Sequence, residues 1–105
     1  MGSRSDRVFR SPEAAEDLAS IWQFGAEEWS PAQADQHLRD IEALCDRLLA
    51  QPELGRTRDE LLGGMHSFPV PPHVIFYTQS STGINLVRVL HQRHDIEAAF
   101  AGLKL

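Results

Sequence analysis

The stretch SPAQADQHLRDIEALCDRLLAQP, residues 30–52, predicts one long amphipathic helix. Ser30 and Gln33 have the types and spacing of a helix capping box, and Pro31 suits the first helical position. Pro52 ends the pattern, because proline lacks the amide hydrogen that a continuing helix needs. Between these limits, apolar residues recur at the spacing of one helix face: Ala34, Leu38, Ile41, Leu44, Cys45, Leu48 and Leu49.

A second helix is predicted just before this one. Ser11 can cap it, Pro12 fits its first turn, and the pattern continues to about residue 28. Its apolar stripe consists of Ala14, Ala15, Leu18, Ile21, Trp22 and Gly25. Three carboxylates are expected on its other faces: Glu16, Asp17 and Glu27. Only Trp29 and Ser30 separate the two helices, so the chain must fold back as an antiparallel hairpin.

Short β segments flank the hairpin. Residues 7–10 predict one strand before it, and β-branched and aromatic content predicts three after it, at residues 65–70, 73–78 and 84–91. Short connections make these three an antiparallel meander. Strict alternation in the last strand places Ile84, Leu86, Arg88 and Leu90 on one face, and Asn85, Val87, Val89 and His91 on the other. Asp95 can cap a brief helix after it.

The element order β-α-α-β-β-β predicts an α+β fold. An antiparallel helical hairpin should pack on one face of a small, mostly antiparallel sheet, with a short C-terminal helix. At 105 residues the chain is expected to be one domain over residues 7–100, with flexible ends at 1–6 and 101–105. Its 42% apolar and 24% charged residues are ordinary for a globular protein.

The lone cysteine and the absence of long apolar runs indicate the compartment. Cys45 cannot form an internal disulfide, and its place in the apolar stripe predicts a small buried hydrophobe rather than a nucleophile. No run of eighteen apolar residues and no apolar segment behind Arg4 and Arg7 is present, so neither a membrane span nor a signal peptide is expected. We therefore predict a cytoplasmic protein of a bacterium or archaeon, with no membrane partner.

The net charge of −5 is unevenly distributed. Residues 13–60 hold twelve acids and four arginines, whereas residues 61–105 hold three bases and two acids. Such an acidic middle is a poor match for a phosphate backbone, whose binding is dominated by lysine and arginine. Direct binding of nucleic acid is therefore disfavoured.

The histidines do not predict a metal site. His91 and His94 lie three apart beside Asp95, and His66 and His73 belong to the same predicted sheet. Zinc requires three or four converging ligands, usually at fixed spacings, and none of these spacings is diagnostic. We predict no metal and no cofactor.

Cleavage of RNA is the catalytic alternative. Attack by a 2′-hydroxyl needs a base, an acid and cationic groups near the phosphate. The predicted sheet offers these types of residue: His66, Tyr77, Arg88, His91 and Arg93. Alternation along the last strand places Arg88 and His91 on opposite faces, so these groups need not converge. No catalytic residue is therefore predicted.

The element order and several local strings resemble the ParE branch of the RelE/ParE toxin superfamily, from Val8 to about Phe100. No single string is specific, but together they occur in the family's order and spacing. They are Ser11-Pro12 with Ala15 and Asp17-Leu18, Ile21-Trp22, Pro52-Glu53-Leu54-Gly55-Arg56, Ser67-Phe68-Pro69-Val70 followed by His73-Val74-Ile75-Phe76-Tyr77, and the strand from Ile84 to Arg93.

The resemblance implies the toxin of a type II toxin–antitoxin pair. Its antitoxin would be a ParD-like ribbon-helix-helix protein whose C-terminal segment wraps the toxin in a hetero-oligomer, and DNA would be contacted only through that antitoxin. ParE-type members inhibit DNA gyrase by binding it, whereas RelE-type members cleave mRNA on the ribosome. Because Lys104 is the only lysine and the chain is acidic, the non-enzymatic ParE interpretation is favoured over the ribonuclease.

Two departures from the family leave a third interpretation open. Many relatives have Gly-Leu-Arg where this chain has Gly64-Met65-His66, and Phe-Tyr-Arg where it has Phe76-Tyr77-Thr78. Each change removes an arginine from the sheet region, which weakens the ribonuclease interpretation. The chain could also be an attenuated toxin that serves mainly in autorepression with its antitoxin.

We predict a partner-contact surface in place of an active site. Its polar candidates are Arg88, His91 and Arg93 at the end of the last strand, together with His66. Its apolar candidates are Phe24, Trp29, Phe68 and Val70, each of which has the alternative of being a core residue. The acidic hairpin would suit a basic antitoxin tail.

Overall fold

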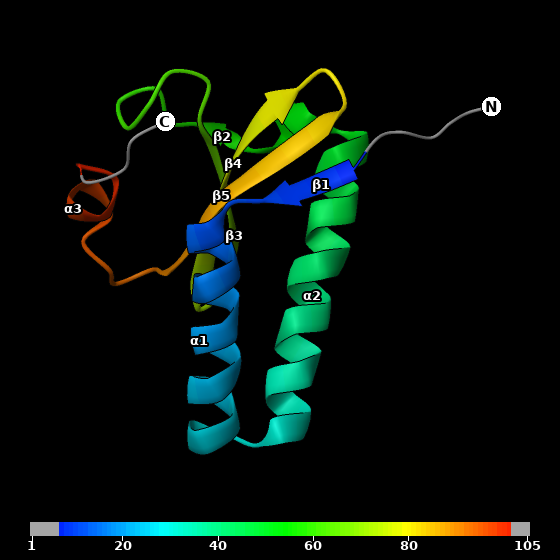
Figure 1. Cartoon of the computed structure of the whole chain (residues 1–105), viewed down its shortest axis with the longest axis vertical. Coiled ribbons are helices and arrows are strands. Elements are labelled where there is room, and N and C mark those ends of the chain that lie inside the picture. The colour runs from blue at the N-terminus through cyan, green and yellow to red at the C-terminus, as the bar shows by residue number, and fades with distance from the viewer. Residues whose placement is uncertain (1–6, 102–105) are drawn as a thin grey trace.

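The computed structural model describes residues 7–101. Its elements are β1 (Arg7–Arg10), α1 (Pro12–Glu28), α2 (Pro31–Ala50), the 3-10 turn η1 (Pro52–Leu54), β2 (Arg56–Thr57), β3 (His66–Val70), β4 (His73–Ser80), β5 (Gly83–His91) and α3 (Ile96–Ala101). Figure 1 shows α1 and α2 side by side as a hairpin whose free end reaches well beyond the sheet. The predicted α+β fold is confirmed.

Both helices of the hairpin begin at their predicted serines. Ser11 Oγ accepts a hydrogen bond from the backbone N–H of Ala14 at 2.9 Å, and Ser30 Oγ accepts one from the N–H of Gln33 at 3.1 Å. Ser11 has a second role, because its hydroxyl donates to the carbonyl oxygen of Val87 at 2.7 Å. That bond joins the start of α1 directly to β5.

The sheet has five strands in the order β1-β5-β4-β3-β2. The predicted antiparallel meander of β3, β4 and β5 is confirmed, and β1 pairs in parallel with β5, with Arg7 opposite Gly83. Gly83 has a φ of 147°, and a Cβ there would overlap the Arg7 carbonyl, so this close pairing requires glycine. The two-residue strand β2, paired with β3, lies in a segment predicted to be only a connector.

The alternation along β5 breaks at Val87, so the predicted faces of Val89 and Leu90 are wrong. Leu86 lies opposite Tyr77 and Arg88 lies opposite Phe76, which leaves Val87 without a counterpart on β4. A β-bulge of this kind shifts the residues after it to the other face. Accordingly, Ile84, Leu86 and Val89 pack in the core under the hairpin, whereas Val87 and Leu90 pack in the core on the opposite face.

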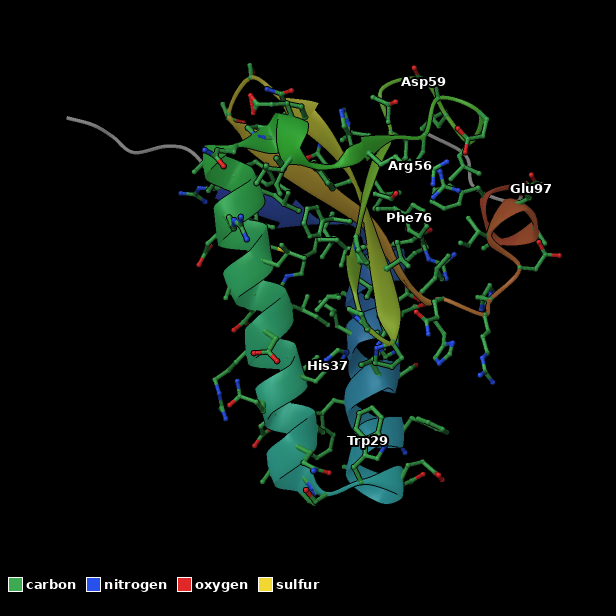
Figure 2. The ribbon with its side chains drawn as sticks, turned by 180° about the vertical axis from the view of Figure 1, so that it is seen from behind. Trp29, His37, Arg56, Asp59, Phe76 and Glu97 are labelled. Carbon is green, nitrogen blue, oxygen red and sulfur yellow. The ribbon has the colours of Figure 1, made fainter. Side chains whose placement is uncertain are left out.

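The sheet is covered on both faces. The main core lies between the hairpin and the sheet and includes Ile41, Leu48, Ile75 and Tyr77. The opposite core contains Met65, Phe76, Val87, Leu90 and Phe100, and the ring centroids of Phe76 and Phe100 are 5.0 Å apart. Figure 2 shows Phe76 on the side of the sheet that faces α3.

The last helix runs to the predicted C-terminal limit of the domain and slightly beyond it. The N–H of Ala98 bonds to Asp95 Oδ1 at 3.2 Å, which confirms the predicted cap of the last helix. That helix ends at Ala101, one residue beyond the predicted limit of the domain. The remaining predicted flexible ends, 1–6 and 102–105, lie outside the described residues. None of the helices within residues 7–101 combines the length and apolarity needed to cross a membrane.

Candidate partner-binding surface

Arg88 is held in an ion pair with Asp17 of α1. Arg88 Nε lies 2.7 Å from Asp17 Oδ2, and its Nη2 lies 3.0 Å from Oδ1. The same carboxylate accepts the N–H of Val89 at 2.9 Å. These hydrogen bonds raise the pKa of Arg88, mainly because they stabilise its charged form. Asp17 was expected on an outer face of its helix; that expectation is wrong, since Asp17 faces β5.

Tyr77 joins the sheet to the segment that follows the hairpin. Its hydroxyl donates to the carbonyl oxygen of Pro52 at 2.6 Å and accepts the N–H of Gly55 at 2.9 Å. The residue is fully buried, and burial raises the pKa of its hydroxyl. A Cβ on Gly55 would overlap the hydroxyl, so glycine is required for this approach. The hydroxyl proton of Tyr77, which an acid catalyst would have to deliver, is already donated in the hydrogen bond to the carbonyl oxygen of Pro52.

The other candidate groups of a ribonuclease fall at separate places on the sheet. His66 lies opposite Tyr77 and stacks on it at a centroid distance of 5.4 Å, with its Nδ1 3.2 Å from the carbonyl oxygen of Gly64. His91 lies opposite His73, four residues back along β4. Since a strand rises about 3.3 Å per residue, His66 and His91 are separated by about 13 Å along the strands. A single phosphate could not contact both.

His37, His73 and His91 form a cluster where α2 meets the sheet. His37 Nε2 lies 2.8 Å from His73 Nδ1, and the ring of His91 meets His73 edge-on at a centroid distance of 5.5 Å. Burial is the main cause that lowers the pKa of His37, and burial together with the neighbouring His37 and His91 lowers the pKa of His73 to about 4. Such a bond needs at least one neutral ring, because one nitrogen must accept the proton of the other.

His37 was absent from the predicted site, although the sequence carried a signal for it. It lies three residues after Ala34 and one before Leu38, on the apolar stripe of its helix. A polar residue in such a stripe needs a hydrogen-bond partner within the fold, because an unpaired buried polar group is costly. Its partner, His73, could not be named without the arrangement of α2 over β4.

Neither a metal site nor a reactive thiol is assembled in the described part of the chain. Within residues 7–101, no group of three histidine, cysteine, aspartate or glutamate side chains is placed to hold a metal ion. Cys45 is buried, as predicted, and burial raises the pKa of its thiol to about 11. At neutral pH the thiol is therefore protonated and weakly nucleophilic.

The apolar candidates divide into exposed and packed residues. Phe24 is 60% exposed and Trp29 is 48% exposed, both near the free end of the hairpin. Phe68 and Val70 are half-buried and pack against the main core. The polar candidates His91 and Arg93 are exposed, and the N–H of Arg93 bonds to His91 Nδ1 at 3.1 Å.

Three hollows mark the surface. One of about 290 Å³ lies between β1 and the hairpin, where Val8, Leu18 and Leu38 form an apolar floor beside Arg10 and Glu42. A second, of about 270 Å³, is lined by residues that include Phe24, His73, Arg88, His91 and His94. Arg88 and His91 therefore line one hollow, although they were predicted to lie on opposite faces. The third, of about 340 Å³, lies beside Trp29 and His37.

Known proteins share both sequence and fold with this chain. Residues 8–96 match the family described as ParE toxin of type II toxin-antitoxin system, parDE. The chain belongs to the ParE toxin family. It is 38% identical over 94 residues to Toxin ParE1 of Mycobacterium tuberculosis strain H37Rv, an alignment that covers 89% of this chain and 96% of the relative.

A second curated relative supports the family, and a solved structure shares the fold. Toxin ParE3 of Caulobacter vibrioides is 30% identical over 92 residues, covering 88% of this chain and 92% of the relative. A solved structure described as chromosomal ParDE TA system from P. aeruginosa superposes with a TM-score of 0.70 at 19% identity, covering 85% of this chain and 98% of that one. The predicted resemblance to the ParE branch is thus confirmed, and the protein is a toxin of a type II toxin–antitoxin system.

Proposed function

We propose that this ParE toxin acts by binding DNA gyrase without catalysing a reaction, and that a ParD-like antitoxin neutralises it. The observation that carries the non-catalytic part is the engagement of the polar groups a ribonuclease would use. The Tyr77 hydroxyl is bonded to Pro52 and Gly55, and Arg88 is paired with Asp17. Breaking these bonds to free the groups for RNA would weaken the fold. Gyrase acts on chromosomal DNA, so the cytoplasm is the expected compartment.

The antitoxin part is supported by family and by charge. The family match is to the toxin of a parDE pair, and the structural neighbour comes from a ParDE system. In this chain, residues 12–50 carry nine carboxylates and two arginines, a surface that would attract a basic antitoxin segment. The antitoxin would form a hetero-oligomer with the toxin and would provide its only contact with DNA.

A supercoiling assay tests the gyrase proposal. Purified toxin should inhibit supercoiling of relaxed plasmid by gyrase, and prior addition of the ParD-like antitoxin should restore it. Gyrase that stays fully active at saturating toxin would exclude the proposal. Primer extension that reveals cuts within translated codons would instead favour the ribosome-dependent ribonuclease.

Met65 and Thr78, two of the residues that depart from the family pattern, have structural roles, so we propose that these changes leave an intact toxin fold. Met65 is fully buried in the core beside α3. Thr78 Oγ1 accepts a hydrogen bond from Asn85 Nδ2 at 3.2 Å across β4 and β5. Expression without antitoxin should therefore arrest growth. Normal growth despite folded, abundant toxin would favour an attenuated protein that serves in autorepression.

A further inference from the structure

The third hollow lies between the free end of the hairpin and the turn that joins β3 to β4. We call it the tip hollow; its lining includes Trp29, Gln36, His37, Asp40, Pro71 and Pro72. Figure 2 shows Trp29 at the end of the hairpin and His37 higher on α2, where both approach the lower end of the strands. Three separate parts of the chain therefore meet around this hollow.

The indole of Trp29 is fixed in position but partly open. On one side it packs over Gly25, where a Cβ would come within 3.3 Å of the Trp29 ring. The ring of His37 meets it edge-on at a centroid distance of 6.3 Å. Even so, 48% of the residue is exposed. An aromatic face that is held rigidly and open to solvent can bind a cation or an apolar group at little entropic cost.

The charge around the tip hollow favours a positively charged ligand. Asp40 is the carboxylate of the lining, and it accepts a hydrogen bond from Gln36 Nε2 at 2.9 Å. Within residues 7–101 the ion pairs are Arg58 with Glu60 and Arg88 with Asp17, so the Asp40 carboxylate is not neutralised there. Burial lowers the pKa of His37, which keeps that ring uncharged at neutral pH. Among residues 7–101, no lysine or arginine lines the hollow.

We propose that the tip hollow receives an arginine or lysine side chain of the antitoxin. The aliphatic stem would pack on Pro71 and Pro72, and the charged head would lie over Trp29 and beside Asp40. A cation over an indole face contributes attraction that grows with desolvation, and a charge-assisted bond to Asp40 adds to it. This inference rests on the proposed neutralisation by an antitoxin and states which side chains of the toxin hold the partner.

The test measures the affinity of toxin variants for the ParD-like antitoxin, by isothermal titration calorimetry at low and high salt. Asp40→Asn removes the charge with little change in shape, and Trp29→Leu removes the aromatic face. Each should weaken binding about ten-fold, as expected for loss of one well-placed cation contact. Asp40→Asn should also lessen the salt dependence of the affinity.

Glu28→Gln is the matched control, because it removes one carboxylate beside Trp29 from an exposed position that does not line the tip hollow. It should change the affinity by no more than about two-fold, as for a solvent-exposed charge. Replacing each lysine and arginine of the antitoxin by alanine then locates the partner residue. One replacement should show no further loss when combined with Asp40→Asn.

The outcomes separate this inference from the proposed function. If the wild-type toxin does not bind the ParD-like protein, the proposed neutralisation fails and the inference fails with it. If the wild type binds but both folded variants bind equally well, only the inference is overturned. Loss of gyrase inhibition with unchanged antitoxin binding would also overturn it, because the hollow would then contact the target. If Trp29→Leu lowers the thermal stability of the toxin, the antitoxin affinity of Asp40→Asn alone tests the inference.

Discussion

Two polar residues on the inner side of the hairpin fasten it to the sheet. Asp17 and His37 each lie three residues after a buried alanine, Ala14 and Ala34, and thus on the stripe that faces the strands. Asp17 binds Arg88 and the backbone of β5, and His37 binds His73 at the start of β4. Apolar packing alone is tolerant of sliding, whereas these directional bonds fix the position of each helix along the sheet.

Replacement of Asp17 by asparagine should lower the free energy of unfolding by about 2–3 kcal/mol. The carboxylate and the guanidinium are 14% and 18% exposed, so the variant leaves a mostly buried cation without its counter-ion. Urea denaturation followed by circular dichroism measures the loss. Glu16→Gln removes the adjacent, exposed carboxylate and should change stability by less than about 0.5 kcal/mol. Equal stability of the two variants would contradict the anchoring role of Asp17.

Residues could be predicted from the sequence where their environment is local. The serine caps and the burial of Cys45 follow from neighbours within one helix, and these predictions are confirmed. The roles of Asp17 and Tyr77 could not be derived, because their partners come from distant segments. The partners of the Tyr77 hydroxyl lie 22 and 25 residues away and depend on the packing of η1 against β4.

At the scale of elements, the hairpin and the meander were predictable because each has a clear local signal at its ends. Ser-Pro starts each helix, and short turns join β3, β4 and β5. The bulge at Val87 was not predictable from alternation, since both Val87 and Val89 suit a buried strand position. The strand β2 was missed for another reason, namely that two residues are too few to show a period.

The two helix starts should differ in their contribution to stability. Ser30→Ala removes only a cap and should cost about 1 kcal/mol. Ser11→Ala removes a cap and also the bond to the carbonyl of Val87, so it should cost about 2 kcal/mol. Urea midpoints of the two variants, measured side by side, provide the comparison. Equal losses would mean that the Ser11–Val87 bond adds nothing to the cap.

For the whole molecule, the histidine cluster predicts a loss of stability in mild acid. The pKa of His73 is about 4 in the fold against 6.5 for an ordinary histidine, because the buried ring resists charging. Between these values the unfolded chain binds more protons, so stability rises with pH. The contribution should be complete above pH 6.5 and should be lost by about pH 4, a difference of about 3 kcal/mol.

Urea unfolding at a series of pH values checks this expectation. His73→Gln should be less stable at neutral pH but should show a flatter pH dependence between about pH 4 and 6.5. His94→Gln serves as the control, because it removes an exposed histidine that lies outside the buried cluster. A slope in the His73 variant equal to that of the wild type would assign the acid sensitivity to other groups.

The pairing of β1 with β5 limits how early the sheet can form while the protein is being synthesised. The first strand has no partner until the last one exists, and the bond from Ser11 to Val87 spans 76 residues. A chain still emerging from the ribosome can form the α1–α2 hairpin, but it cannot close the sheet before residues 83–91 have been made. Contacts so distant in sequence also form late and slowly. The complete fold of the toxin therefore forms only after β5 has been made, although both helices of the hairpin can form earlier.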